Sequence, residues 1–140
     1  MATLDQPTDR SKAKATAAVL KYEPVVYESP SEGPRLVRVH LEEIFTGDIE
    51  ALGVAEVIQA VRADRSANYV TIERVTGTLA GRTGAFLLQV TGIIEGGQIK
   101  GDWFVVPGSG VGELAGLRGE GGFQGDVGDG APVYLDYWFE

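Results

Sequence analysis

The sequence predicts an all-β fold, a single antiparallel eight-stranded β-barrel with little or no helix. Short runs in which apolar and polar residues alternate recur along most of the 140 residues, and this alternation is the period of a β-strand. Glycine-rich turn sequences separate the runs at the spacing of a meander. No stretch shows an apolar period of about 3.6 residues over about eleven residues. Sequential hairpins of this kind close into a barrel or pack as two sheets, and closure removes exposed edges.

The expected strands are the alternating runs, at 12–22, 24–29, 35–46, 52–62, 68–79, 84–95, 98–106, 118–124 and 132–139. The joints between them carry Gly, Pro, Asp, Asn and Ser, which favour turns. Residues 49–63 also allow a helix, because Ala, Glu and Gln favour helices. Gly53 and the alternation of Val57, Gln59 and Val61 favour a strand instead. Polar, mixed residues at 1–11 are expected to form a disordered tail, which leaves 12–140 as the barrel domain.

The segment PGSGVGELAGLRGEGGF, residues 107–123, raises the question of a phosphate-binding loop. Its glycines at 108, 110, 112 and 116 do not form the G-x-G-x-x-G pattern, and the residues that follow are too rich in glycine for a helix. No Lys-Ser or Lys-Thr pair follows, as a P-loop requires. The glycines are therefore expected to turn the chain between two strands, and no cofactor is expected.

Charge and composition exclude several other classes. The net charge of −8 argues against binding to nucleic acid and to anionic membranes. With no cysteine and one histidine, neither a thiol nucleophile nor a zinc site is expected. The sequence GDVGDG at 125–130 offers carboxylates, but it lacks the closing Glu and the helices of an EF-hand, so we expect a turn and no metal. The N-terminus lacks the pattern of a signal peptide, which indicates a cytoplasmic protein.

Two short turns predict a register for residues 68–106. If Gly81-Arg82 and Gly96-Gly97 are two-residue turns, Val75 lies opposite Leu88, and Val90 lies opposite Trp103. The bulkier, more apolar face should then point inward, and it consists of Tyr69, Thr71, Glu73, Val75, Phe86, Leu88, Val90, Ile94, Ile99, Trp103 and Val105.

Glu73 is the unusual member of this inward face. An isolated carboxylate in apolar surroundings costs several kcal/mol or takes up a proton. Two interpretations are open. Glu73 either pairs with an arginine or lies near a wet barrel mouth, or it acts as an acid or base in a cavity.

The strand at 35–46 is ambiguous in its orientation. Val37, Val39 and Leu41 share one face, and His40 and Glu42 lie on the other. By hydrophobicity alone the valine face is the inner one, which places His40 and Glu42 on the surface.

Several segments together resemble the allene oxide cyclase-like barrels, to which dirigent proteins are related. The resemblance rests on IFTGDI (44–49), GVAEVIQAV (53–61), NYVTIERVTGTL (68–79), FLLQVTG (86–92) and VYLDYWF (133–139), with the strand-GSG-turn-GLRG pattern of 107–123. The closest similarity, through ERVTGTLAGRTGAFLLQ and PGSGVGELAGLRGEGGF, is to a bacterial family of unknown function in that superfamily. The resemblance implies an eight-stranded barrel with an apolar cavity, and a homodimer or homotrimer.

The resemblance also implies site residues. In the plant cyclases a carboxylate on the first strand helps to open a fatty-acid epoxide, and it corresponds to Glu23 here. The remaining correspondences are Val25 for that carboxylate's polar partner, His40 for a cavity aromatic, Glu42 for a water-binding asparagine, Gln59 for a cysteine, Tyr69 for an aromatic wall residue and Gly92 for a tyrosine. Val25 and Gly92 thus depart from the cyclase pattern.

The two interpretations of the strand at 35–46 conflict, because the resemblance turns His40, Glu42 and Gln59 inward. A bulge near Glu42-Glu43 would reconcile them, and on this ground we follow the resemblance. The expected inward polar set is then Glu23, His40, Glu42, Gln59, Thr71 and Glu73.

The expected function is the binding of a small apolar molecule in the barrel, with cofactor-free cyclase or isomerase activity as its catalytic form. The catalytic candidates are Glu42, Glu73, Glu23 and His40. The expected cavity-lining residues are Gln59, Tyr69, Thr71, Phe86, Leu88, Val90 and Trp103. Two alternatives are a non-catalytic ligand-binding module and a barrel filled by its own side chains, such as Phe86 and Tyr137, that serves self-assembly.

Overall fold

The computed structural model describes residues 10–128 and 130–140, and these residues form strands and turns without a helix. The strands are β1 (Ser11–Glu28), β2 (Arg35–Gly47), β3 (Ile49–Val61), β4 (Ala67–Leu79), β5 (Arg82–Glu95), β6 (Gln98–Val105), β7 (Val111–Gly112), β8 (Leu117–Asp126) and β9 (Ala131–Phe139). The described part of the chain contains no helix long and apolar enough to cross a membrane.

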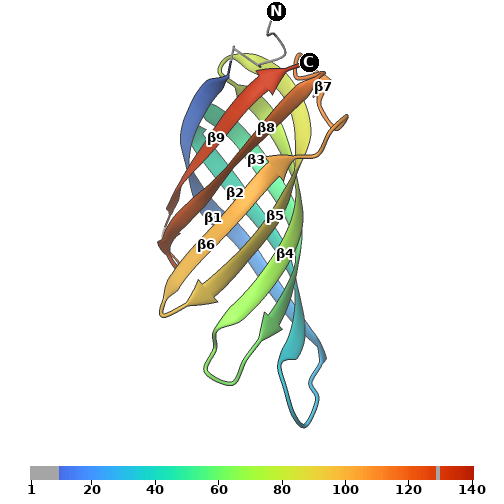
Figure 1. The fold of residues 1–140 in the computed structure, drawn as a ribbon, viewed down its shortest axis with the longest axis vertical. Coiled ribbons are helices and arrows are strands. Elements are labelled where there is room, and N and C mark those ends of the chain that lie inside the picture. The colour runs from blue at the N-terminus through green and yellow to red at the C-terminus, as the bar shows by residue number, and fades with distance from the viewer. Residues whose placement is uncertain (1–9, 129) are drawn as a thin grey trace, which may run out of the picture.

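Eight long strands close into one antiparallel barrel (Figure 1). Each strand pairs with the next in the order β1-β2-β3-β4-β5-β6-β8-β9, and β9 returns to pair with β1. The two-residue strand β7 adds to β5 at one end of the barrel. The predicted fold class is therefore confirmed, including a strand at 49–61.

The first strand is longer than the sequence indicates. The runs predicted at 12–22 and 24–29 are one strand, whose pairing with β2 shifts between Val19 and Lys21 and again between Val26 and Glu28. Of the tail predicted at 1–11, residues 1–9 lie outside the described residues, and Ser11 already belongs to β1.

The predicted register is correct for β5 and β6, where Val90 pairs with Trp103. Between β4 and β5 it is wrong by two residues. The turn consists of Ala80 and Gly81, both with positive φ (49° and 85°), so Val75 pairs with Phe86. A shift of two residues keeps every side chain on its face of the sheet, and the predicted inward face is buried or half-buried as expected.

The inward orientation of His40 and Glu42 is wrong. Alternation continues unbroken along β2, with Val39 and Phe45 buried, and the bulge lies in β1 at Leu20 instead. Hydrophobicity alone therefore gives the correct face for β2.

Large side chains fill one half of the barrel. Fully buried residues gather towards the end that carries the β2–β3 and β4–β5 turns, and they include Phe45, Leu79, Phe86, Leu114, Leu117 and Leu135. The segment 107–123 contributes to this end: its glycines turn the chain twice, at Gly112 and Gly116 with positive φ, so that Leu114 tucks into the barrel. The prediction that these glycines turn the chain between two strands is confirmed.

The opposite half is less complete. β1 pairs with β9 only from Ser11 to Ala17, whereas its pairing with β2 continues to Glu28. The β1–β2 hairpin extends beyond the rest of the barrel at this end (Figure 1). Residues 18–28 consequently have a strand partner on one side only among the described residues, and the barrel is open beside them.

Candidate functional site

The open half of the barrel encloses a cavity of about 650 Å³. Its walls come from β1, β2, β3, β4, β5, β6, β8 and β9, and they are mostly apolar or aromatic. Eight residues expected inside the barrel line it: Gln59, Tyr69, Thr71, Glu73, Val90, Ile94, Ile99 and Trp103. Phe86 and Leu88, predicted as lining residues, are buried but do not line the cavity.

Trp103 forms the base of the cavity. Its ring lies between Phe45, in the filled half at a centroid distance of 6.4 Å, and Phe123, a cavity-lining residue at 5.2 Å. The indole Nε1 donates a hydrogen bond to the backbone oxygen of Tyr134 at 2.9 Å. These contacts hold the ring in place between the filled half of the barrel and the cavity.

Tyr69 forms part of the wall because two glycines make room for its ring. A Cβ at Gly92 would lie 2.3 Å from the ring carbon Cζ, and one at Gly101 would lie 2.9 Å from the hydroxyl. The hydroxyl donates to the backbone oxygen of Lys100 at 3.0 Å. Burial raises the pKa of Tyr69, with smaller contributions from the nearby acidic charges, so the phenol stays neutral.

Two carboxyl groups meet at the deep end of the cavity, those of Glu43 on β2 and Glu73 on β4. Strand β3 lies between β2 and β4, and the two side chains meet over Gly53 of β3. Gly53 pairs with Glu43, and Ala55 pairs with Glu73. A Cβ at Gly53 would lie 2.1 Å from Glu73 Oε2 and 3.0 Å from Phe45 Cε1. The absence of a side chain at this one position lets the two acids approach.

Glu73 is held in its neutral form. Its side chain is 2% exposed, and burial raises its pKa well above the ordinary value, with further contributions from a hydrogen bond to Glu43 and from the like charge of that residue. Glu73 Oε2 receives no hydrogen bond from an N–H or hydroxyl group of the described residues. Two carboxyl groups in contact need a proton between them, so the pair is a proton donor buried beside an apolar cavity.

The pairing of Glu73 differs from the first interpretation of the sequence. Its partner is another carboxyl rather than an arginine, and it lies at the base rather than at the mouth. Its role as an acid or base stays a prediction. Alternation along β2 points to Glu43, because the face of Val37, Val39 and Leu41 continues through it, but the resemblance directed attention to Glu42.

The mouth of the cavity is more polar and more exposed. Gln59 Nε2 donates to the Tyr22 hydroxyl at 3.4 Å, and Tyr22 is 54% exposed. Asp126, Val127 and Gly128, where β8 leads into the β8–β9 connection, also line the cavity.

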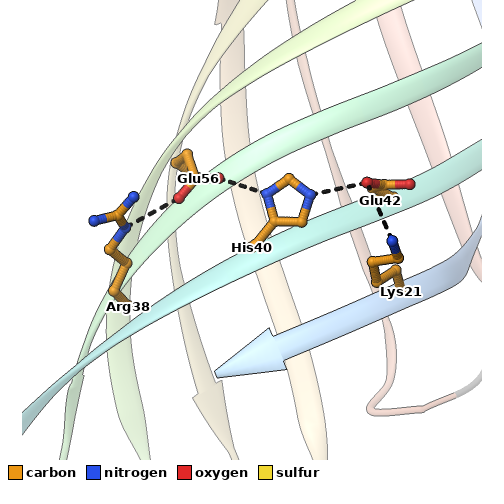
Figure 2. Close-up of polar contacts among 5 residues, drawn as sticks. All are labelled: Lys21, Arg38, His40, Glu42 and Glu56. Atoms are coloured by element: carbon orange, nitrogen blue, oxygen red, sulfur yellow. Dashed lines mark hydrogen bonds and ion pairs between the residues drawn. The ribbon is translucent and has the colours of Figure 1, made fainter. Parts of the chain in front are cut away.

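Two of the remaining catalytic candidates, His40 and Glu42, lie outside the barrel in a row of charges that Figure 2 shows. His40 contacts Glu56 Oε2 through Nδ1 at 2.6 Å and Glu42 Oε2 through Nε2 at 2.9 Å. Arg38 Nε continues the row to Glu56 Oε1 at 3.1 Å, and Lys21 Nζ lies 3.9 Å from Glu42. We call these five residues the outer charge row.

The outer charge row has its own electrostatic consequences. Hydrogen bonds to Glu56 and Glu42 raise the pKa of His40, and the same bonds lower the pKa values of the two carboxyl groups. Glu23 is exposed, and in the β1–β2 register it lies opposite His40, so it also faces solvent. The structure thus brings Glu42 and His40 together, but it separates these residues and Glu23 from Glu73 and from the cavity.

Within residues 10–128 and 130–140, no three His, Cys, Asp or Glu side chains are grouped so that they could hold a metal ion.

Residues 13–137 match the model of a family described as a protein of unknown function, DUF3224. The chain is also similar to a crystal structure of a DUF3224-family protein of unknown function from Shewanella oneidensis MR-1. The two share 35% sequence identity and superpose with a TM-score of 0.80 over 94% of this chain and 99% of that one. No curated protein matches the sequence.

Proposed function

Because the chain belongs to the DUF3224 family, whose function is unknown, we propose its function from the cavity itself: the barrel binds a small, mostly apolar molecule in its open half. The observation that carries this proposal is a cavity of about 650 Å³ with apolar and aromatic walls and a few polar groups. Ligand sites in proteins generally combine these features and fall in this range of volumes.

The filled-barrel alternative accounts for one half of the molecule only. Phe86 and Leu88 do fill part of the barrel, but they do not line the cavity. A barrel that served self-assembly alone would gain stability by filling the other half as well, because buried apolar contacts stabilise the fold. The unfilled half therefore favours ligand binding.

Tryptophan emission tests the proposal. The chain has two tryptophans, so Trp138→Phe leaves Trp103 as the single reporter at the base of the cavity. Titration of this variant with eight-carbon and ten-carbon alcohols should give a saturable change in emission, and the same ligands should raise the midpoint of thermal unfolding.

A matched control comes from the other tryptophan. In Trp103→Phe the remaining reporter, Trp138, stacks against the Arg10 guanidinium at 4.2 Å, and its emission should not respond. If no ligand in a panel of apolar alcohols, acids and polyenes changes either the emission or the midpoint, the binding proposal is wrong.

Catalysis is a second candidate, and the Glu43–Glu73 pair favours it. A carboxyl group that stays protonated can donate a proton to a bound substrate, and its partner can remove one, which is the chemistry of a cofactor-free isomerase or cyclase. Glu73→Gln preserves the shape of the side chain but removes the transferable proton. For any ligand that is converted, this variant should bind it and no longer produce product. Unchanged turnover would exclude Glu73 as the acid.

The broader relation to allene oxide cyclase-like barrels stays a prediction, as do the cytoplasmic location and the homodimer or homotrimer. Self-association finds support on the outer face of β3 and β4, where Val54, Ile58, Val70 and Ile72 are exposed, with Ile58 and Val70 paired across the strands. Large adjacent apolar side chains in water favour association. Light scattering of the wild type and of Val70→Glu tests it: a smaller mass for the variant is expected.

A further inference from the structure

The ionisable groups that line the cavity are all acids. They are Glu43, Glu73 and Asp126, and no Lys, Arg or His of the described residues lines it. Neither carboxyl of the deep pair takes part in an ion pair with a described base. A ligand that brings a negative charge into this space meets no compensating group.

The deep pair has no hydrogen-bond donor other than the proton that it holds. Glu73 Oε2 is buried and receives no hydrogen bond from an N–H or hydroxyl group of the described residues, and its polar neighbour is a second carboxyl. Buried polar atoms of folded proteins nearly always have a partner. A positively charged donor would supply the missing hydrogen bond and would be attracted by the two neighbouring acids.

The aromatic walls also suit a cation. Tyr69, Trp103 and Phe123 line the cavity, and Trp103 lies at its base. The faces of such rings attract ammonium groups when water is excluded. This feature is independent of the carboxyl pair and points to the same kind of ligand.

We infer that the ligand is an amphiphilic amine, whose ammonium group binds the Glu43–Glu73 pair and whose apolar chain extends along the cavity towards its mouth. The inference rests on the binding function proposed above and adds the chemical class of the ligand. The ammonium group donates hydrogen bonds to the carboxyl oxygens, and the apolar chain lies against Val57, Val90 and Ile94.

The pair determines selectivity more than affinity. Burying an ammonium removes its hydration, and this loss offsets much of the attraction to the carboxyl groups. An ionised carboxylate ligand loses its hydration too, and it is repelled instead of attracted. The amine should therefore bind better than the alcohol of equal length, and the carboxylate should bind worst.

A matched series tests this ranking: octylamine, octanol and octanoate at pH 7 and below the concentrations at which they aggregate. At this pH the amine is protonated and the acid is ionised. Emission of Trp103 in the Trp138→Phe background and thermal unfolding supply two readouts. The expected dissociation constant of octylamine is lower than that of octanoate by about tenfold or more, since the two ligands differ in charge beside the same acids.

Two variants separate the pair from the overall negative charge of the protein. Glu43→Gln combined with Glu73→Gln should abolish the preference for the amine, while retained octanol binding shows that the cavity is intact. Glu32→Gln, which removes a charge from an exposed turn residue, should leave the ranking unchanged.

The outcomes are distinct. Octanoate binding as tightly as octylamine overturns the inference and leaves the binding function standing. An amine preference that survives the double substitution also overturns it, because the cause then lies elsewhere on an acidic protein. Failure of all three ligands to bind contradicts the proposed function itself.

Discussion

At the scale of single residues, a glycine controls the site. Gly53 does not have a positive φ, so its backbone conformation does not require glycine. The position requires glycine because a side chain there would occupy the space in which Glu43 and Glu73 meet. Any side chain at position 53 would occupy the volume of the Glu73 carboxyl. The acid pair thus depends as much on the missing side chain as on the acids.

Gly53→Ala should displace Glu73. The new Cβ would lie 2.1 Å from Glu73 Oε2, so the carboxyl must move, and overpacking of this kind lowers the free energy of unfolding by about 1–3 kcal/mol. Gly125→Ala is a matched control, because its Cβ would come no closer than 3.3 Å to Ala131. Urea unfolding should show a loss for the first variant and little change for the second. Equal effects would contradict the role of Gly53.

Glu73→Gln should stabilise the protein at neutral and alkaline pH. The folded-state pKa of Glu73 is raised, so the folded protein retains a proton that the unfolded chain releases. Between the ordinary pKa and the raised one, the stability of the wild type falls as the pH rises. The variant lacks this loss. Unfolding curves should therefore coincide more closely near pH 4 than near pH 8, where the variant is the more stable.

A control for this prediction is Glu32→Gln, which alters an exposed acid in the β1–β2 turn. The difference in the free energy of unfolding between Glu32→Gln and the wild type should vary little between pH 4 and pH 8. If the advantage of Glu73→Gln over the wild type did not grow between pH 4 and pH 8, the raised pKa of Glu73 would be contradicted.

At the scale of elements, the bulge in β1 decides which residues meet. Beyond it, Lys21 pairs with Glu42 and Glu23 pairs with His40, all on the outer face. Tyr22 lies on the inner face and reaches Gln59 at the cavity mouth. One extra residue in β1 thus exchanges the faces of its second half.

The outer charge row makes His40 a sensitive reporter of β2 and β3. As the single histidine, it gives one imidazole signal in a proton NMR titration. Its midpoint should lie above the ordinary value of 6.5, and Glu56→Gln should lower it more than Glu42→Gln does, because the Glu56 hydrogen bond is the larger cause. A midpoint at or below the ordinary value would show that the row is not formed in solution.

The sign of the effect on stability follows from the same shift. The pKa of His40 is higher in the folded protein than in the unfolded chain. The contribution of the outer charge row to the free energy of unfolding is therefore complete below the unfolded-state pKa of His40. It is lost as the pH rises through the folded-state pKa. His40→Gln should therefore lose most relative to the wild type at acidic pH.

At the scale of the whole molecule, the barrel is divided into a filled half and an open half. Leu117→Ala lies in the filled half, where the side chain is 1% exposed, and should lower the free energy of unfolding by about 2–5 kcal/mol. Ile94→Ala, a substitution at a half-buried lining residue, should cost below about 2 kcal/mol, because its neighbours already leave space.

Ligand binding should respond in the opposite order. Ile94→Ala enlarges the cavity and should change the affinity for the eight-carbon alcohols, whereas Leu117→Ala should leave it nearly unchanged when measured well below the unfolding midpoint. Equal stability losses for both variants would contradict the division of the barrel.

Part of this architecture follows from the sequence. Two-residue alternation and turn glycines predict the strands, the barrel and the inward face of β4 and β5, because these features depend on local geometry. The alternation of Val37, Val39 and Leu41 likewise gave the correct face of β2, and the resemblance gave the wrong one. The error arises because the bulge was predicted in β2, near Glu42-Glu43, whereas it lies in the neighbouring strand β1.

The inward direction of Glu73 follows from the amino-acid sequence, since the two faces of a strand follow from its alternation. The contact of Glu73 with Glu43 across Gly53 depends on the fold, because it joins β2 and β4 through the registers of two strand pairs. The half-filled barrel depends on the fold as well. Whether facing side chains touch or leave a cavity depends on how far apart the closed sheet holds them, and alternation along a strand does not encode that distance.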